Sequence, residues 1–126
     1  MNLQINKDMS IISHILEYCK QIEECHSRFG NSEGCFMSDA IYRNAVSMAE
    51  YQIGELSGRL SEDFKEQHRT EIPWKEIRGM RNIFAHNYLE MDKTKIWSVA
   101  VYDIPILRSF CERQLDQYKQ NQGKSE

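Results

Sequence analysis

The chain has 126 residues, close to the commonest size of one folded domain, so we expect a single domain over residues 1–126. Hydrophobic residues make up 40% and charged residues 28%, with six glycines and two prolines. This composition is too apolar for a disordered chain and too poor in turn residues for an all-β sandwich. The net charge of −3 excludes attraction of nucleic acid by an overall positive charge, so any such contact must be local.

The cysteines and the N-terminal residues favour a cytoplasmic protein without membrane contact. The four cysteines match neither a zinc pattern nor a dense disulfide framework, so we expect reduced thiols, with Cys19 and Cys111 in the core. Residues 1–7 lack the apolar run of a secretory signal, and no segment approaches the roughly 18 apolar residues of a membrane span.

The first predicted element is an amphipathic helix. From Asp8 onward, apolar residues recur at three- and four-residue steps, and the pattern ends in the region of Gly30 and Asn31. Residues 29–37 are rich in glycine and small polar residues, which is typical of a loop.

A second, long helix follows this loop. Ser38 or Asp39 is a candidate N-cap, and the apolar positions then run from Ile41 to Leu60. The pattern predicts one helix in spite of Gly54 and Gly58, each of which costs about 1 kcal/mol of helix propensity.

A polar stretch, residues 61–71, separates this helix from a third, which we expect to begin near Ile72 with Pro73 in its first turn. On an ideal helix its inner side would carry Trp74, Ile77, Met80, Arg81, Phe84 and Tyr88.

The last part of the chain also has a helical pattern. Asp92 is a candidate cap for a fourth helix, and Asp103 and Pro105 indicate a kink or restart before the final apolar stretch. The polar residues 119–126 are expected to fray. No stretch alternates long enough for a strand, so we predict an all-α fold, a bundle of four or five helices.

Candidate catalytic side chains concentrate in the third helical segment. At about 100° per residue, Asn82 and His86 share one face with Arg78, whereas Arg81 lies about 140° from His86. Either the helix breaks at His86, or a second subunit brings Arg81 and His86 to one substrate. The alternative is that Arg81 pairs with an acid such as Glu55 and that His86 only ends the helix.

Metal and cofactor patterns are missing from the sequence. No two histidines are four residues apart, and there is no glycine-rich phosphate loop. We therefore expect neither a metal nor a cofactor.

Arg81 to His86 form an R-x4-H motif, which Tyr88 extends to R-x4-H-x-Y. With its surroundings, this motif resembles the HEPN superfamily, and specifically its HepT-like branch, the toxin half of MntA/HepT toxin-antitoxin pairs. The matching surroundings are Arg43 to Ala49, Ile53-Gly54-Glu55, Ile72-Pro73-Trp74, Gly79-Met80-Arg81-Asn82, Trp97 and Ile104-Pro105. Leu56 departs from the small residue that the family often has there.

The resemblance implies an all-helical protein that forms a twofold dimer, in which two motifs face one cleft and cleave RNA without metal, with transfer RNA among the candidate substrates. Arg81 and His86 would then be catalytic: His86 titrates near neutrality and suits proton transfer, and Arg81 offers a fork of donors to a phosphate. Asn82 would orient His86 or hold a phosphate, and Arg78 would support phosphate binding.

In HepT-like proteins, the tyrosine of H-x-Y is where the partner nucleotidyltransferase attaches AMP. The resemblance therefore implies that Tyr88 is a modification site and that a minimal nucleotidyltransferase antitoxin is a partner. AMP beside His86 would fill the cleft and repel incoming RNA.

Residues 65–81 supply a local positive charge that could bind RNA, with five basic residues against three acidic ones. The basic residues are Lys65, Arg69, Lys75, Arg78 and Arg81. Three hypotheses remain open: a dimeric ribonuclease toxin, a non-catalytic partner of a nucleotidyltransferase that binds a nucleotide or phosphate, and a purely structural helical protein.

Overall fold

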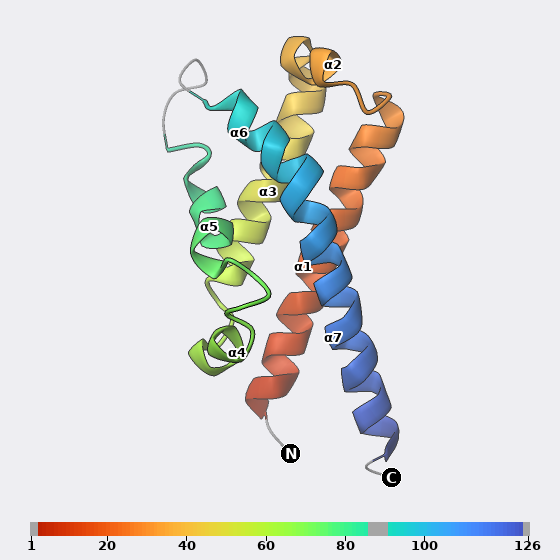
Figure 1. Ribbon diagram of the computed structural model, residues 1–126, viewed down its shortest axis with the longest axis vertical. Helices are drawn as coiled ribbons and strands as arrows, with labels where there is room; N and C mark the ends of the chain where they lie inside the picture. Colours follow the sequence, from red (N-terminus) through yellow and green to blue (C-terminus); the bar gives the residue numbers. More distant parts are fainter. Residues whose placement is uncertain (1–2, 86–90, 125–126) are drawn as a thin grey trace.

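Three long helices run side by side in the computed structural model: α1 (Leu3–Arg28), α3 (Ala40–Ser57) and α7 (Ile104–Lys124) (Figure 1). The structure describes residues 3–85 and 91–124. α1 packs along both α3 and α7, and each of the three contributes fully buried side chains to one core. No strand occurs among the described residues, and the predicted all-α fold class is confirmed.

Two short helices lie where the sequence pattern predicts no helix. The expected loop over residues 29–37 contains α2 (Glu33–Ser38), and the polar stretch after α3 contains α4 (Glu62–Gln67). A serine caps each N-terminus, because the Ser32 and Ser61 side chains accept hydrogen bonds from backbone amides of the first turn. One buried phenylalanine, Phe36 or Phe64, anchors each helix to the core.

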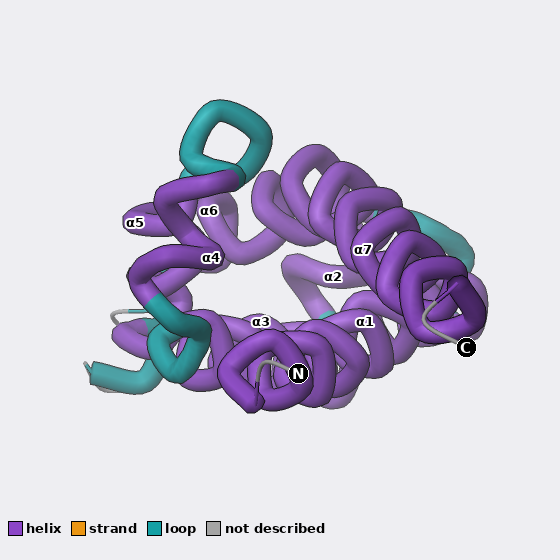
Figure 2. Tube along the Cα trace, turned by 90° about the horizontal axis from the view of Figure 1, so that it is seen from below, coloured by secondary structure: helices purple, strands orange, loops and turns teal. Residues whose placement is uncertain are grey.

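The predicted cap of the long second helix is confirmed. The Asp39 carboxylate accepts hydrogen bonds from the amides of Ile41 (2.9 Å) and Tyr42 (3.2 Å), and α3 begins at Ala40. α3 contacts α1 along one side and α5 (Trp74–Gly79) along another. α4 and α5 lie on the opposite side of the molecule from the C-terminal part of α7 (Figure 2).

The end of the chain forms one continuous helical path. α6 (Lys93–Ser98) is capped by Asp92, as predicted, and passes through a π-helical segment, Val99–Asp103, into α7. The Ile104 amide donates to the Val99 carbonyl five residues back, and this wider turn accommodates Pro105, which lacks an N–H. The expected kink or restart is thus a π turn. α7 extends to Lys124. The expectation that residues 119–126 fray stays a prediction.

The predicted burial of two cysteines is confirmed. Cys19 and Cys111 are completely buried, and all four cysteines are unpaired, as expected. No helix among residues 3–85 and 91–124 has both the length and the apolar character needed to cross a lipid bilayer.

Candidate active site

Arg81 and Asn82 lie in a tight 3₁₀ turn, Met80–Asn82, that follows α5 directly. The α-helix therefore ends at Gly79, and the chain continues through turns to Ala85. The expected third helix thus does not run as one α-helix through Asn82, which lies in the 3₁₀ turn.

The 3₁₀ turn divides buried from exposed side chains. Met80 is buried and Ile83 half-buried, whereas Arg81, Asn82 and Phe84 are exposed. The prediction that Arg81 and Phe84 share the inner side with Met80 is therefore wrong. A tight turn changes the angular spacing of successive side chains, so that the apolar side chains still reach the core while the arginine reaches solvent.

Gly54 of α3 fixes the position of this turn. A Cβ atom at Gly54 would lie 2.4 Å from the amide nitrogen of Arg81 and 2.9 Å from the carbonyl carbon of Met80. Since real Cβ atoms do not approach that closely, only glycine allows the two backbones to touch here. The core helix thereby holds the Arg81 backbone directly.

Arg78 lies close to Arg81 in sequence, but its guanidinium is directed at α3. Its Nη1 donates to the backbone carbonyls of Gly54 and Glu55, both at 3.3 Å, near the C-terminal end of α3. A Cβ atom at Gly58 would lie 1.7 Å from this nitrogen, so Gly58 leaves the space that the guanidinium fills. The cation also interacts favourably with the helix dipole.

The two remaining site residues predicted from the sequence, His86 and Tyr88, lie outside the described residues. The alternative pairing of Arg81 with Glu55 is not observed: none of the ion pairs between described residues includes Arg81.

Four of the five predicted basic residues line a shallow groove of about 330 Å³ between α4 and α5. They are Lys65, Arg69, Lys75 and Arg78. Glu62 and Glu66 also line it and pair with Lys65 (3.0 Å) and Arg69 (3.1 Å). The groove keeps a net positive charge.

A cavity of about 450 Å³ borders the turn and contains a carboxyl group that was not predicted from the sequence. It lies among α3, α5 and the path from α6 into the π-helical segment, and Glu50 of α3 lines it. Glu50 is 1% exposed, and its Oε2 has no hydrogen-bond partner among the described residues. Burial raises the pKa of Glu50 well above its usual value, and the Asp103 carboxylate raises it further.

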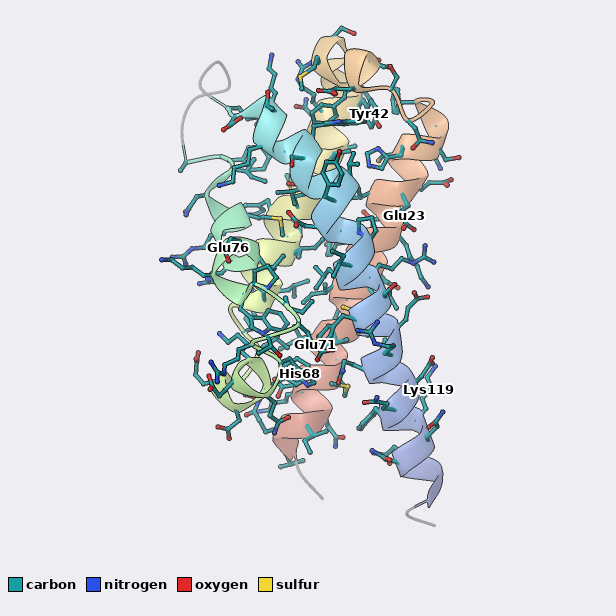
Figure 3. The ribbon with its side chains drawn as sticks, in the orientation of Figure 1. Glu23, Tyr42, His68, Glu71, Glu76 and Lys119 are labelled. Atoms are coloured by element: carbon teal, nitrogen blue, oxygen red, sulfur yellow. The ribbon has the colours of Figure 1, made fainter. Side chains whose placement is uncertain are left out.

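Three more carboxyl groups line the same cavity: Asp103 of the π-helical segment, Glu76 of α5 and Asp92, the cap of α6. Figure 3 labels Glu76 on α5. Burial raises the pKa of Asp103, and the negative charge of Glu76 adds to this effect. Among the described residues, no three acidic, histidine or cysteine side chains have an arrangement that could hold a metal ion. The carboxyl groups thus line the cavity as separate hydrogen-bonding groups.

A sequence signal for Glu50 did exist. Arg43, Ser47 and Glu50 follow helical spacing on α3, and all three are buried on a polar stripe beside its apolar stripe. The Arg43 Nη1 donates to the carbonyls of Phe36 and Met37, which ties α3 to α2.

The sequence of this chain is similar to those of a known family and of several known proteins. The model of the family described as "Ribonuclease HepT-like" matches residues 15–114. A candidate RNase from Caldanaerobacter subterraneus subsp. tengcongensis is 32% identical over 108 residues, covering 86% of this chain and 94% of that protein.

Two further relatives match shorter stretches. A protein named "Probable ribonuclease HepT" from Thermococcus cleftensis is 37% identical over 78 residues, covering 62% of this chain and 70% of its own. A candidate RNase from Methanocaldococcus jannaschii is 35% identical over 77 residues, covering 61% of this chain and 70% of its own. Solved structures gave no significant match.

Proposed function

Because the chain belongs to the HepT-like ribonuclease family, we propose that two copies form a metal-independent endoribonuclease whose shared site contains Arg81 and His86 of each copy. The observation that carries the proposal is the position of Arg81. Its backbone is held against α3 at Gly54, while its side chain is exposed and has no ion pair with a described residue. A fixed, accessible guanidinium suits binding of a phosphate.

The proposed reaction is attack of a ribose 2′-oxygen on the adjacent phosphorus, with release of the 5′-oxygen of the next nucleotide. A base must take the 2′-hydroxyl proton, an acid must protonate the leaving oxygen, and a cation must stabilise the charge on the phosphate oxygens. Arg81 supplies the cation. His86 of one copy acts as the acid, and its counterpart in the second copy acts as the base. Asn82 orients His86 or holds a phosphate oxygen.

Exposed apolar side chains on the outer face of α3 and after the Arg81 turn, here called the apolar strip, support the dimer. Ile41 and Met48 on the outer face of α3 are 74% and 49% exposed, and Phe84, three residues after Arg81, is 42% exposed. The Phe84 ring contacts Tyr51 of α3, with the ring centroids 5.6 Å apart. Covering this strip with a second copy in a twofold arrangement would bring two Arg81 side chains toward one another.

The basic groove between α4 and α5 offers a path for the RNA backbone. Lys75 and Arg78 line the groove and lie on α5, which leads directly into the turn that carries Arg81. Contacts of this kind are independent of sequence and weaken as salt increases.

The decisive experiment is incubation of the purified protein with total RNA in EDTA. We expect cleavage by the wild type, and a loss of about 10²- to 10⁴-fold in rate for His86→Ala, the range for a group that transfers a proton. Arg81→Ala and Arg81→Lys should also be poor, since an ammonium group cannot replace the guanidinium fork.

Matched controls are the exposed residues His14 and Arg28 of α1. His14→Ala and Arg28→Ala should cleave like the wild type. Full activity of His86→Ala would overturn the assignment. Tight RNA binding without cleavage by the wild type would favour a non-catalytic phosphate-binding partner instead.

We further propose that the protein is the toxin of a toxin-antitoxin pair and that a nucleotidyltransferase silences it by adding AMP to Tyr88. The tyrosine hydroxyl is required for this modification but not for proton transfer. After co-expression with the cognate nucleotidyltransferase, intact mass should increase by whole AMP units on the wild type but not on Tyr88→Phe, which should stay an active nuclease. AMP on both proteins would place the modification elsewhere.

A further inference from the structure

The cavity of about 450 Å³ lies directly against the turn that carries Arg81. Met80 and Asn82, the two sequence neighbours of Arg81, both line it, and so does Gly79. A group inside the cavity is therefore close to the point where a phosphate would meet Arg81. The volume lies within the usual range of small-ligand pockets and exceeds what a single nucleobase needs.

The walls of the cavity are mostly apolar. They come from α5, the 3₁₀ turn and the path through α6, and they include Pro73, Ile77, Ile83, Met91, Ile96 and Val99. Apolar walls with a few polar groups suit a ring that carries hydrogen-bonding atoms on its edge.

Acidic side chains outnumber the other charged groups among the described residues of the cavity: Glu50, Glu76, Asp92 and Asp103 line it, against one cation, Lys95. Glu50 is buried and its Oε2 has no partner among the described residues, while Asp103 and Glu76 present further carboxyl oxygens. The excess of acidic side chains in this lining disfavours a phosphate inside the cavity, so the phosphate of a nucleotide would stay outside, beside Arg81. An unpaired buried polar group is costly, which favours a ligand that forms a hydrogen bond with the Glu50 carboxyl group.

We propose that this cavity binds a nucleobase with an exocyclic amino group, taken from the nucleotide next to the phosphate that Arg81 holds. This inference rests on the proposed ribonuclease function and specifies how the same site selects its substrate. Adenine, cytosine and guanine each carry an amino group that can donate to a carboxylate. Uracil presents a carbonyl oxygen instead, and this acceptor repels a carboxylate oxygen of Asp103. Single-stranded RNA offers such bases unstacked and accessible.

Cytidine and uridine form the sharpest pair of probes, because they differ mainly in the amino and carbonyl groups at one ring position. We would titrate the isotope-labelled protein with each nucleoside and follow its backbone amide signals by NMR. Cytidine should shift the signals of Gly79, Asn82 and Ser98, which line the cavity, and should bind about tenfold more tightly than uridine, the effect of one hydrogen bond to a charged acceptor. Equal affinities would overturn the proposal.

Asp103→Asn tests the carboxylate itself. The amide can donate to the uracil carbonyl, so this variant should lose most of the preference for cytidine over uridine. Asp116→Asn, an exposed change on α7 outside the cavity, should keep the wild-type preference. A preference that survives in Asp103→Asn would remove this residue from base recognition and contradict the proposal.

Two further experiments are needed. One covers the case in which Asp103→Asn does not fold, and the other tests whether an organic cation occupies the cavity instead. If Asp103→Asn does not fold, as judged by circular dichroism, Asp103→Ala provides the same test. An excess of spermidine at constant ionic strength should not displace cytidine; displacement would assign the cavity to an organic cation and overturn the proposal.

Nucleoside binding does not require cleavage, so the two proposals can fail separately. If RNA is cleaved through His86 but neither nucleoside enters the cavity, the base pocket is wrong and the ribonuclease remains. If cytidine binds selectively but RNA is never cleaved, the pocket remains and the proposed catalytic function is wrong.

Discussion

Gly54 and Arg81 meet backbone to backbone, at a distance that leaves no room for a side chain on the helix. A Cβ atom at Gly54 would lie 2.4 Å from the amide nitrogen of Arg81 and 3.2 Å from its Cα. The core helix α3 thus holds the backbone of Arg81 in place, together with the turn that carries it.

Gly54→Ala should therefore damage both stability and activity. The added methyl group must push the Met80–Asn82 turn away from α3, and overpacking of this kind costs about 1–3 kcal/mol. Chemical denaturation would measure the free energy of unfolding, and RNA cleavage would fall because Arg81 moves. Gly79→Ala is the matched control: nothing lies within 4 Å of its added Cβ, so stability should be unchanged or rise by about 0.4–1 kcal/mol. Equal effects of the two substitutions would contradict the backbone contact.

The contact also shows which features of the fold can be predicted from a sequence and which cannot. The helical pattern indicates only that Gly54 lowers helix propensity, because a single sequence does not reveal which backbone approaches a glycine. The long helices were predictable, since their apolar stripes and caps are local patterns, as at Asp39 and Asp92. The short helices α2 and α4 were not, because six residues are too few for a periodic pattern and one phenylalanine anchors each.

The sequence was enough to predict which residues form the candidate site, but not how they are arranged in space. The spacing from Arg81 to His86 is a property of the sequence, whereas the end of α5 at Gly79 depends on the contact between α3 and the following turn. Glu50 was missed because the polar stripe on α3 does not reveal the cavity that α5 and α6 form around its carboxyl group.

Arg78 and Arg81 should respond differently to substitution, although they lie three residues apart. Arg78→Met removes two hydrogen bonds to the α3 carbonyls and should lower the free energy of unfolding by about 1–2 kcal/mol, since a half-buried cation is partly compensated by water. Arg81→Met should change stability by less than about 0.5 kcal/mol, as is usual for an exposed side chain. Thermal and chemical denaturation of both variants tests this difference. A larger loss for Arg81→Met would mean that its side chain supports the fold.

Glu50 should make stability depend on pH. Its pKa is raised in the folded protein, so the stability associated with its neutral form is fully present below the unfolded-state value of 4.5 and is lost as pH rises toward the raised value. Glu50→Gln keeps the shape without the charge. The stability of the wild type relative to Glu50→Gln should therefore decrease as pH increases above 4.5 and be constant below it.

Urea denaturation of both proteins across this pH range provides the measurement. Glu33→Gln, an exposed substitution in the first turn of α2, is the control for a general effect of removing one carboxylate. A difference between wild type and Glu50→Gln that does not vary with pH would show that Glu50 ionises as readily in the folded as in the unfolded protein.

The apolar strip should determine whether the protein forms an active dimer. Met48→Glu places a charge in the middle of this strip, where two copies in a twofold arrangement would bring the carboxylates close together and lose apolar contact. Light scattering at micromolar concentration should give a dimer for the wild type and a monomer for Met48→Glu, and RNA cleavage should fall in parallel. The folded monomer should keep its stability within about 0.5 kcal/mol, because Met48 is not part of the core.

Ile106→Glu on α7 changes a side chain that is 59% exposed and should leave both the dimer and cleavage unchanged. A wild type that is monomeric yet cleaves RNA would show that Arg81 and His86 meet within one chain.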